Sequence, residues 1–490
     1  MRAVVVGAGL GGLACALRLQ AQGLDVTVVE QRERPGGRAY QLRDGGFTWD
    51  TGPSLITMPW VLEETFAAAG LDVWSELSLR RLDPLYRIHW AGDERTLDFT
   101  DDVDRLREQI ARFSVRDAAR LDGFLAALAP IYREAIVGAG RRAITSPREF
   151  AGLLPMMVRL RAAEPLSYFV ARHFEHPRVR EAFSFHSLFI GGDPHRVPAV
   201  YGALVYLQIL DGGWYADGGV YSLVEALARS LDLRCGEPVE AIETARGRVT
   251  GVRLAGGERL DADVVVSNAD VLRTHELLGR RPPRRRLRPT MSCFLLYLGT
   301  NRTFEERLLH HTLLVGHGYR DFIRTVTRGP ALPSTYSTYV HAPSRTEPGM
   351  ARPGGDSLCV LLPVPNLRDA PLAWDREGDR LRDALVADLE QTFGLEGLDA
   401  SIEVEHRMDP AAFARELGAV DGNAFAIEPT LHQSAYLRPP NRARGVRGLY
   451  LTGGGTHPGA GIPGVLLGAG VTAGLVLADA GVPARERVTA

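Results

Sequence analysis

The chain has 490 residues, of which 45% are hydrophobic and 24% charged, so it is long enough for two or three domains with buried cores. This composition excludes a disordered chain, a collagen-like fibre and a disulfide-stapled miniprotein. The formal net charge of -2 offers no general attraction to nucleic acid, so any partner must be recognised at a local site.

The cysteine, histidine and lysine content limits the kinds of metal site and catalytic group that the protein can have. The four cysteines include no Cys-x-x-Cys pair, which fits a reducing compartment and argues against a zinc ribbon or an iron–sulfur cluster. The pairs His173/His176 and His310/His311 have no carboxylate or thiolate at a metal-binding spacing, so we predict no metal site. All 57 basic residues are arginine, which excludes Schiff-base chemistry and a Walker-type phosphate lysine.

The sequence contains no targeting signal that we recognise. Its first residues lead directly into an apolar strand and not into a charged and then hydrophobic leader, so we expect a cytoplasmic protein. Residues 449–478 carry no charged side chain, but they are rich in glycine and interrupted by Pro458 and Pro463. We therefore do not expect a membrane-spanning helix there.

The first thirty residues predict a strand, a helix and a second strand. Residues 2–6 form an apolar run, and Leu10, Leu13, Ala14 and Leu17 repeat at the spacing of a half-buried helix. Gly23 ends this helix, and the β-branched run 26–29 closes on Glu30. This is the βαβ unit of a doubly wound sheet.

The remaining chain alternates between helical and strand-like stretches. Residues from about 70 to 187 are helical in pattern and predict an inserted cap. Apolar runs then predict strands at 239–242, 249–254, 264–266, 293–298, 358–362 and 448–451, with a helix at 380–393 and another at the C-terminus. The run 264–266 is continuously apolar and is expected in the parallel sheet.

We therefore predict an α/β protein with a Rossmann-type nucleotide-binding domain assembled from three separated segments. These segments are 1–70, 220–290 and 440–490. The intervening segments 71–219 and 291–439 would build a mixed α+β substrate domain, with a helical cap at about 120–180.

A glycine fingerprint follows the first predicted strand. In Gly7-Ala8-Gly9-Leu10-Gly11-Gly12, the first glycine permits a tight turn, and the second lets backbone approach a pyrophosphate. The glycine at position 12 lets the helix pack close to the strand, while helix N-terminal amides neutralise the phosphates. Glu30 is placed to accept hydrogen bonds from the adenosine ribose hydroxyls.

The glycine fingerprint alone does not separate FAD from NAD as the cofactor. The segment that bears on this choice is Arg34-Pro35-Gly36-Gly37-Arg38. It resembles the second cofactor segment of the FAD-dependent amine oxidase and carotenoid desaturase superfamily. The resemblance implies that the glycines pass beside the pyrophosphate and that the arginine reaches it.

Residues 453–465 combine small residues with a predicted helix start at Pro463. Small residues let a planar ring lie against backbone. The positive end of the helix would then stabilise an anionic reduced flavin at its N1–C2=O edge, which favours hydride acceptance.

This C-terminal block closely resembles the signature of the bacterial-type phytoene desaturases. Further matches occur in the family's order at 50–54, 183–194 and 197–202, so that the resemblance extends from residue 4 to residue 475. It implies FAD as cofactor, a carotenoid polyene as substrate, and stepwise removal of hydride plus proton from CH2–CH2 units. Phytoene-to-lycopene conversion in carotenoid biosynthesis is the expected function.

The resemblance also implies individual cofactor contacts. The ADP part of FAD would be contacted by Gly7, Gly9, Gly12, Glu30, Gly37 and Arg38. The backbone of Val239 would pair with the adenine, and the flavin ring would be contacted by Gly455, Gly464 and Val465. The run of three glycines at 453–455 departs from the family's usual Gly-x-Gly or Gly-Asp-x form, which leaves contacts in this loop open.

The sequence identifies no catalytic base. Asp193, His195 and His457 lie in the resembling motifs, but a structural role is favoured for each. The alternatives are a later-step carotenoid desaturase or isomerase, an amine or porphyrinogen oxidase, and a non-enzymatic carrier. The absence of lysine disfavours an amine oxidase, because many of these resemble the chain in fold but hold a lysine near flavin N5.

A polyene must be taken from the bilayer, so we expect a peripheral membrane protein that passes electrons to oxygen or a quinone. Residues 150–158 have no polar side chain and are flanked by Arg141, Arg142, Arg148, Arg159 and Arg161, which fits either an interfacial segment or a buried cap helix. The arginines of 280–288 would lie in a solvated loop or touch lipid phosphate.

Overall fold

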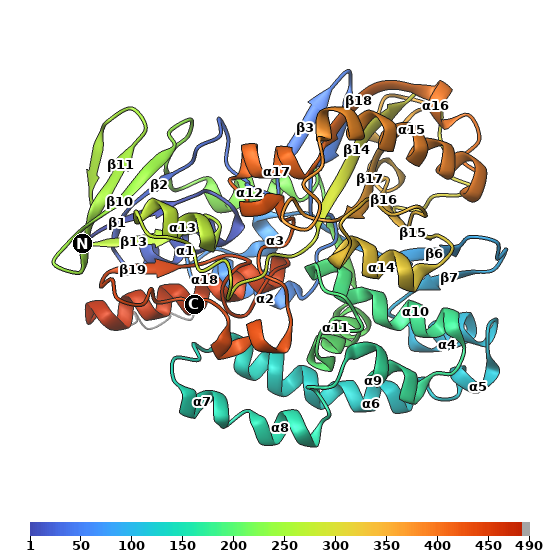
Figure 1. The fold of residues 1–490 in the computed structure, drawn as a ribbon, viewed down its shortest axis with the longest axis horizontal. Coiled ribbons are helices and arrows are strands. Elements are labelled where there is room, and N and C mark those ends of the chain that lie inside the picture. The colour runs from blue at the N-terminus through green and yellow to red at the C-terminus, as the bar shows by residue number, and fades with distance from the viewer. Residues whose placement is uncertain (483–490) are drawn as a thin grey trace.

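A five-stranded parallel sheet forms the centre of one lobe of the protein (Figure 1). The computed structural model describes residues 1–482. In spatial order the strands are β19 (Leu449–Leu451), β13 (Val264–Ser267), β1 (Arg2–Val6), β2 (Asp25–Val29) and β9 (Asp232–Arg234). The chain therefore returns to this sheet in widely separated segments, and the predicted strand 264–266 is fully buried within it.

The two faces of this sheet are covered differently. On one face α1 (Leu10–Ala21) packs along α18 (Ile462–Ala480), with α2 (Pro59–Ala67) and α12 (Tyr221–Ala228) beside them. On the other face lies an antiparallel sheet of β10 (Val239–Ala245), β11 (Arg248–Leu254) and β12 (Arg259–Asp261). By length and composition α18 could cross a membrane, but half of its apolar window is buried against these neighbours.

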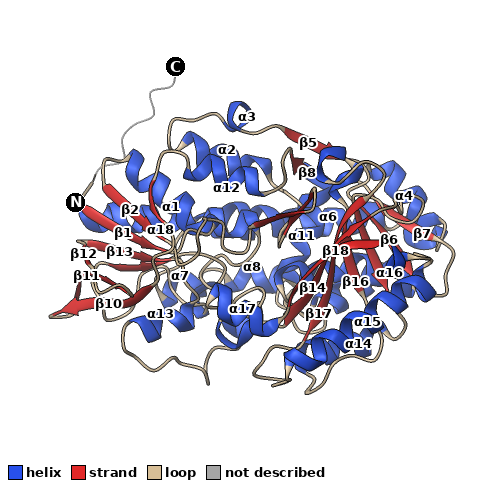
Figure 2. Cartoon of the chain, turned by 90° about the horizontal axis from the view of Figure 1, so that it is seen from above, coloured by secondary structure: helices blue, strands red, loops and turns tan. Residues whose placement is uncertain are grey.

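A seven-stranded mixed sheet forms the second lobe, and Figure 2 shows the two sheets at opposite ends of the molecule. Its strands, in spatial order, are β18 (Ile402–Met408), β14 (Ser292–Thr300), β17 (Asp356–Val364), β16 (Thr338–His341), β15 (His311–Val315), β6 (Tyr86–Trp90) and β7 (Thr96–Phe99). Helices α14 (Tyr319–Arg328) and α15 (Trp374–Phe393) pack beside this sheet. The predicted strands 293–298 and 358–362 and the predicted helix 380–393 lie inside β14, β17 and α15.

A layer of helices lies beneath both lobes in the view of Figure 1. It consists of α4 (Val103–Ala111), α5 (Val115–Ala118), α6 (Leu121–Ile131), α7 (Pro147–Ala151), α8 (Leu154–Arg159), α9 (Leu166–His173), α10 (Pro177–Ser184) and α11 (Ala203–Asp211). The shorter elements are β3 (Gln41–Asp44), β4 (Phe47–Asp50), α3 (Val73–Glu76), β5 (Leu79–Leu82), β8 (Gly213–Ala216), α13 (Val271–Leu277), α16 (Leu398–Ser401) and α17 (Pro410–Leu417).

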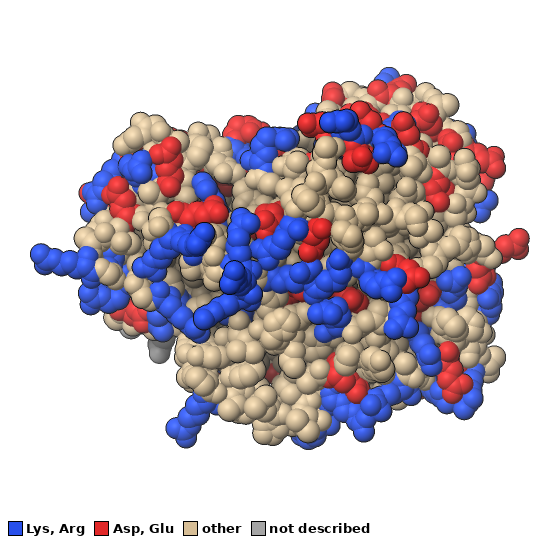
Figure 3. Space-filling view, viewed as in Figure 1, with Lys and Arg blue, Asp and Glu red and all other residues tan. Residues whose placement is uncertain are grey.

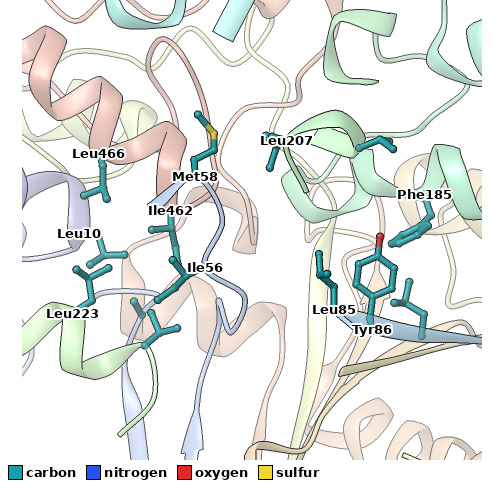
Figure 4. Close-up of a cluster of buried hydrophobic side chains, with 14 of the residues drawn as sticks. Leu10, Ile56, Met58, Leu85, Tyr86, Phe185, Leu207, Leu223, Ile462 and Leu466 are labelled. Carbon is teal, nitrogen blue, oxygen red and sulfur yellow. The ribbon is translucent and has the colours of Figure 1, made fainter. Parts of the chain in front are cut away.

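The largest apolar core continues from one lobe into the other. Figure 4 shows part of it, with Leu10 and Leu466 on the side of the parallel sheet and Tyr86 and Phe185 on the side of the second lobe. The hairpin of β3 and β4 belongs to the first predicted domain segment, yet its aromatic side chains pack against β14 and β17. The predicted domain limits stay a prediction.

Candidate active site

One cavity of about 760 Å³ runs between the lobes. It begins at the carboxyl ends of β1, β2 and β13, which is where open α/β sheets bind their ligands. Most residues predicted to contact FAD line this cavity, namely Gly7, Gly9, Glu30, Gly37, Arg38, Val239, Gly464 and Val465. Gly12 and Gly455 do not belong to its wall.

The glycine loop has the local geometry that its sequence predicts. Gly7 has a φ of +97°, which strongly favours glycine, and Gly9 immediately precedes α1. A Cβ on Gly9 would lie 2.9 Å from Nδ2 of Asn268, which also lines the cavity. A Cβ on Gly12 would lie 2.1 Å from the carbonyl oxygen of Gly7, so Gly12 permits close packing of α1 on β1.

Glu30 connects the end of β2 to the glycine loop. Its carboxylate is buried, with Oε2 accepting from the backbone N–H of Ala8 (2.8 Å) and Oε1 from that of Arg32 (3.0 Å). A carboxylate has further lone pairs beyond these two hydrogen bonds. Glu30 is therefore held in place and can still accept from ribose hydroxyls.

Arg38 is positioned by a chain of polar contacts. Its Nη2 donates to the carbonyl oxygen (3.1 Å) and Oδ1 (3.0 Å) of Asn423, and Asn423 Nδ2 donates to Asp270 Oδ2 (2.8 Å). Burial lowers the pKa of Arg38, and Asp270 opposes this effect. The buried Nε of Arg38 has no hydrogen-bond partner in the described chain, so this N–H remains available to an anion such as a pyrophosphate.

The C-terminal glycine-rich loop leads into α18, which begins at Ile462 with Pro463 in its first turn, as predicted. Gly453, Gly454 and residues 458–465 line the cavity. Buried Arg438 holds the loop by donating to the carbonyl oxygens of Thr456 (2.9 Å) and Gly454 (2.6 Å). A Cβ on Gly455 would instead meet Val271 at 2.5 Å, so the role expected for Gly455 stays a prediction.

These features fit a dinucleotide flavin. The glycine cradle admits close backbone approach, Arg38 keeps a buried donor, and the N-termini of α1 and α18 both open on the same cavity.

The rest of the cavity is a chamber with mainly apolar walls. They are formed by Ile136, Phe185, Leu188, Phe189, Leu204, Leu207, Leu313, Val315, Phe322 and Tyr339. Gln208 supplies a polar group, and its Oε1 accepts from the Tyr86 hydroxyl (2.9 Å), which also contacts His186 Nε2 (2.7 Å). Burial lowers the pKa of His186 to about 3, so this histidine of the predicted motif is a neutral core residue.

The three polar residues considered as possible bases lie outside the cavity wall. Asp193 Oδ1 accepts from the backbone N–H of His195 (2.8 Å), and His195 Nδ1 lies 2.9 Å from Ser167 Oγ. His457 Nε2 lies 3.1 Å from the carbonyl oxygen of Ala139. Each has a structural contact, and we assign no catalytic base.

Sequence reasoning missed several residues of the site. Asn268 and Asp270 follow β13, and their place at the carboxyl end of a parallel strand is a signal that could have identified them. Asn423 reaches Arg38 from a distant loop, and Tyr339 joins Ser54 (3.0 Å) from another sheet. No local pattern marks these two.

Comparison with known proteins places this site in a class. Residues 10–477 match the family described as flavin containing amine oxidoreductase, to which the chain therefore belongs. A structure of an oxidoreductase from Methanosarcina mazei is similar, with a TM-score of 0.64, 18% identity, and coverage of 96% of this chain and 99% of that one. A putrescine oxidase triple mutant gives 0.65 at 14% identity, covering 98% and 99%. These two likenesses concern the fold alone.

Curated relatives define the group within this class. The chain is 40% identical to "Phytoene desaturase (lycopene-forming)" of Pseudescherichia vulneris, over 98% of this chain and 99% of the relative. It is 38% identical to the protein of that name from a Paracoccus species, over 97% of each chain. The "zeta-carotene-forming phytoene desaturase" of Myxococcus xanthus is 38% identical, over 96% and 92%. The chain belongs to the phytoene desaturases.

Proposed function

We propose that this protein is an FAD-dependent desaturase that converts phytoene to lycopene in carotenoid biosynthesis. The observation that carries the proposal is a single cavity that joins the dinucleotide loop to a mainly apolar chamber. Similarity to phytoene desaturases over nearly the whole chain supports it, and two lycopene-forming relatives support the product. Because the relative from Myxococcus xanthus is named as zeta-carotene-forming, zeta-carotene is the alternative product that an assay must distinguish from lycopene.

Bound FAD would supply the hydride acceptor. Glu30 and Arg38 would hold its ADP part, and the N-terminus of α18 would supply positive potential to a flavin ring bound in this cavity. The apolar chamber would exclude water and orient an extended polyene, which would make the reaction effectively unimolecular once FAD is bound. An elongated substrate can then slide through the chamber so that successive CH2–CH2 units react.

The alternatives make different demands on the same cavity. An amine oxidase must hold a cationic or polar substrate, whereas the chamber beside Phe189 and Leu204 offers mainly hydrocarbon. A later-step desaturase or an isomerase would need the same chamber and is distinguished only by its substrate. A carrier would have no use for a helix dipole directed at the redox ring.

The surface over α7 and α8 is the membrane contact in this proposal, with the protein on the cytoplasmic side of the bilayer. Of residues 150–158, Met156 alone is buried, while Leu154 and Val158 are 48% and 77% exposed. Figure 3 shows mostly uncharged atoms at the lower left and centre, where Figure 1 places these helices, and more charge toward the lower right. Exposed apolar side chains bordered by arginine suit a lipid interface.

The arginines near this surface differ in their partners. Arg142, Arg148 and Arg161 are exposed and form no ion pair within residues 1–482, so they are available to headgroups. In the 280–288 segment, Arg284 and Arg288 pair with Asp421 (3.0 Å) and Asp369 (2.7 Å), so these two side chains already have ionic partners. A membrane location also gives access to a quinone, and oxygen is the other candidate electron acceptor.

Anaerobic reduction tests the reaction separately from membrane turnover. We expect phytoene presented in liposomes to bleach the visible absorbance of the FAD-loaded protein while a longer conjugated product forms. Bleaching by amines and not by phytoene would refute the proposal and leave the FAD site intact.

A further inference from the structure

Three buried histidines meet in the seven-stranded sheet. His310, His311 and His341 are 5%, 0% and 2% exposed, and one nitrogen from each lies within 4.8 Å of the other two. His311 and His341 stand directly opposite each other on β15 and β16. The sequence offers only the pair His310/His311, because His341 joins them through strand pairing.

The hydrogen bond of His311 determines its tautomer. Nδ1 lies 3.2 Å from the carbonyl oxygen of Leu85, and a carbonyl only accepts, so the proton resides on Nδ1. Nε2 is then a bare lone pair. It is buried without a hydrogen-bond partner in the described chain, which is an unfavourable state for a polar atom unless something binds it.

The other two rings present nitrogens at a suitable spacing. His310 Nε2 and His341 Nε2 form a hydrogen bond of 3.2 Å, which a bound ion would replace. Bonds of about 2.0–2.1 Å to a tetrahedral zinc ion would place two ligand nitrogens about 3.4 Å apart, close to this spacing. His310 Nδ1 lies 2.6 Å from Thr346 Oγ1 and can donate to it. Such contacts to hydroxyl and carbonyl oxygens orient histidine ligands in metal sites.

Charge and chemistry further define the ligand. All three side chains are buried and offer imidazole nitrogens, which coordinate metal ions in their neutral form. Tyr215 lies edge-on to His310 with 4.8 Å between ring centroids and donates its hydroxyl to Glu347 (2.7 Å). Imidazole ligands favour zinc-class ions over magnesium or calcium.

We propose that His310, His311 and His341 bind one divalent transition-metal ion of the zinc class. The ion would link β15, which carries His311, to β16, which carries His341. Tyr339 lines the cavity and stacks on His311 with 5.5 Å between ring centroids, so the bound ion stiffens that wall. The site does not depend on the proposed function, since none of the three histidines lines the cavity.

The test measures metal in untagged, FAD-loaded protein from zinc-supplemented cells after dialysis against a chelator. We expect about one zinc per chain, and about tenfold less in His311→Gln and His341→Gln. His317→Gln is the matched control, because His317 is exposed and lies in the same segment of chain. Bound FAD per chain reports whether each variant folds.

Two results of the metal analysis would overturn the proposal, and a third comes from X-ray absorption. One is wild-type protein with less than about a tenth of an ion per chain after growth with zinc, cobalt or nickel. The other is equal zinc content in wild type, His311→Gln and His341→Gln. If the variants fail to fold, X-ray absorption of the wild type decides, with nitrogen ligands at about 2.0–2.1 Å expected and a shell of sulfur or of oxygen alone as the contradictory outcome.

Discussion

In the proposed FAD complex, Gly9 would let the backbone come closest to the pyrophosphate. In Gly9→Val, the added side chain would crowd Asn268 in the cavity wall and keep the backbone away from the phosphates, so we expect about tenfold or greater loss of bound FAD. The flavin-to-protein absorbance ratio after gel filtration measures this. Gly123→Val is the control, because Gly123 in α6 has nothing within 4 Å of its added Cβ. Full flavin content in Gly9→Val would contradict the role given to the loop.

Asp50 gives the protein a defined pH dependence. Burial raises its pKa from 3.8 to about 7, so the folded state retains a proton that the unfolded state loses. The favourable contribution is complete below about pH 4 and is lost as the pH rises to about 7, by at most about 4 kcal/mol.

Asp50→Asn removes this titration while its amide oxygen can still accept from the N–H of Val220, which lies 2.9 Å from Oδ2. Urea unfolding across this range should show the variant gaining stability relative to wild type as the pH rises. A stability difference that does not change with pH would contradict the assignment.

At this scale, residues with local roles could be predicted. The positions of Gly7, Gly9 and Glu30 follow from the order of strand, turn, helix and strand, which depends on neighbouring residues only. The orientation of Arg38 could not be predicted, because Asn423 and Asp270 reach it from remote segments.

Substitutions on helix α11 can distinguish polyene binding from FAD binding. Leu204 lines the chamber, and a carboxylate there would have to be desolvated by an apolar substrate. We expect Leu204→Glu to lower phytoene turnover by about tenfold or more while FAD content is unchanged. Leu210→Glu is the matched control, since Leu210 lies on the same helix and is 52% exposed. Equal losses in both variants would contradict the chamber assignment.

Helices α7 and α8 should govern membrane attachment. Replacing both Leu154 and Val158 by aspartate removes apolar contact and adds repulsion from anionic lipid, so we expect about fivefold weaker cosedimentation with anionic liposomes. Val115→Asp is the control, because Val115 is 75% exposed on α5. Undiminished liposome binding with intact FAD content would place the membrane contact elsewhere.

Elements with one strong pattern were predictable, including the buried strand at 264–266 and the helix beginning near Pro463. Strand partners were not. The meeting of His341 with His310 and His311 depends on the register between β15 and β16, which no local periodicity reports.

At the scale of the whole molecule, one continuous apolar core joins the lobe that contains the parallel sheet to the lobe that contains the seven-stranded sheet. The return of strand patterns late in the chain was enough to predict that separated segments build the parallel sheet. The shape of the chamber was not predictable, because its wall draws residues such as Ile136, Leu204 and Tyr339 from different elements.

Conversion of phytoene in liposomes by the purified, FAD-loaded protein, followed by visible absorbance and chromatography of the products, tests the proposed reaction most directly. We expect three-banded visible spectra and lycopene as the final product, with no conversion by Gly9→Val. No spectral change with phytoene or with coloured carotenoids, together with peroxide release from an amine, would contradict the proposed reaction.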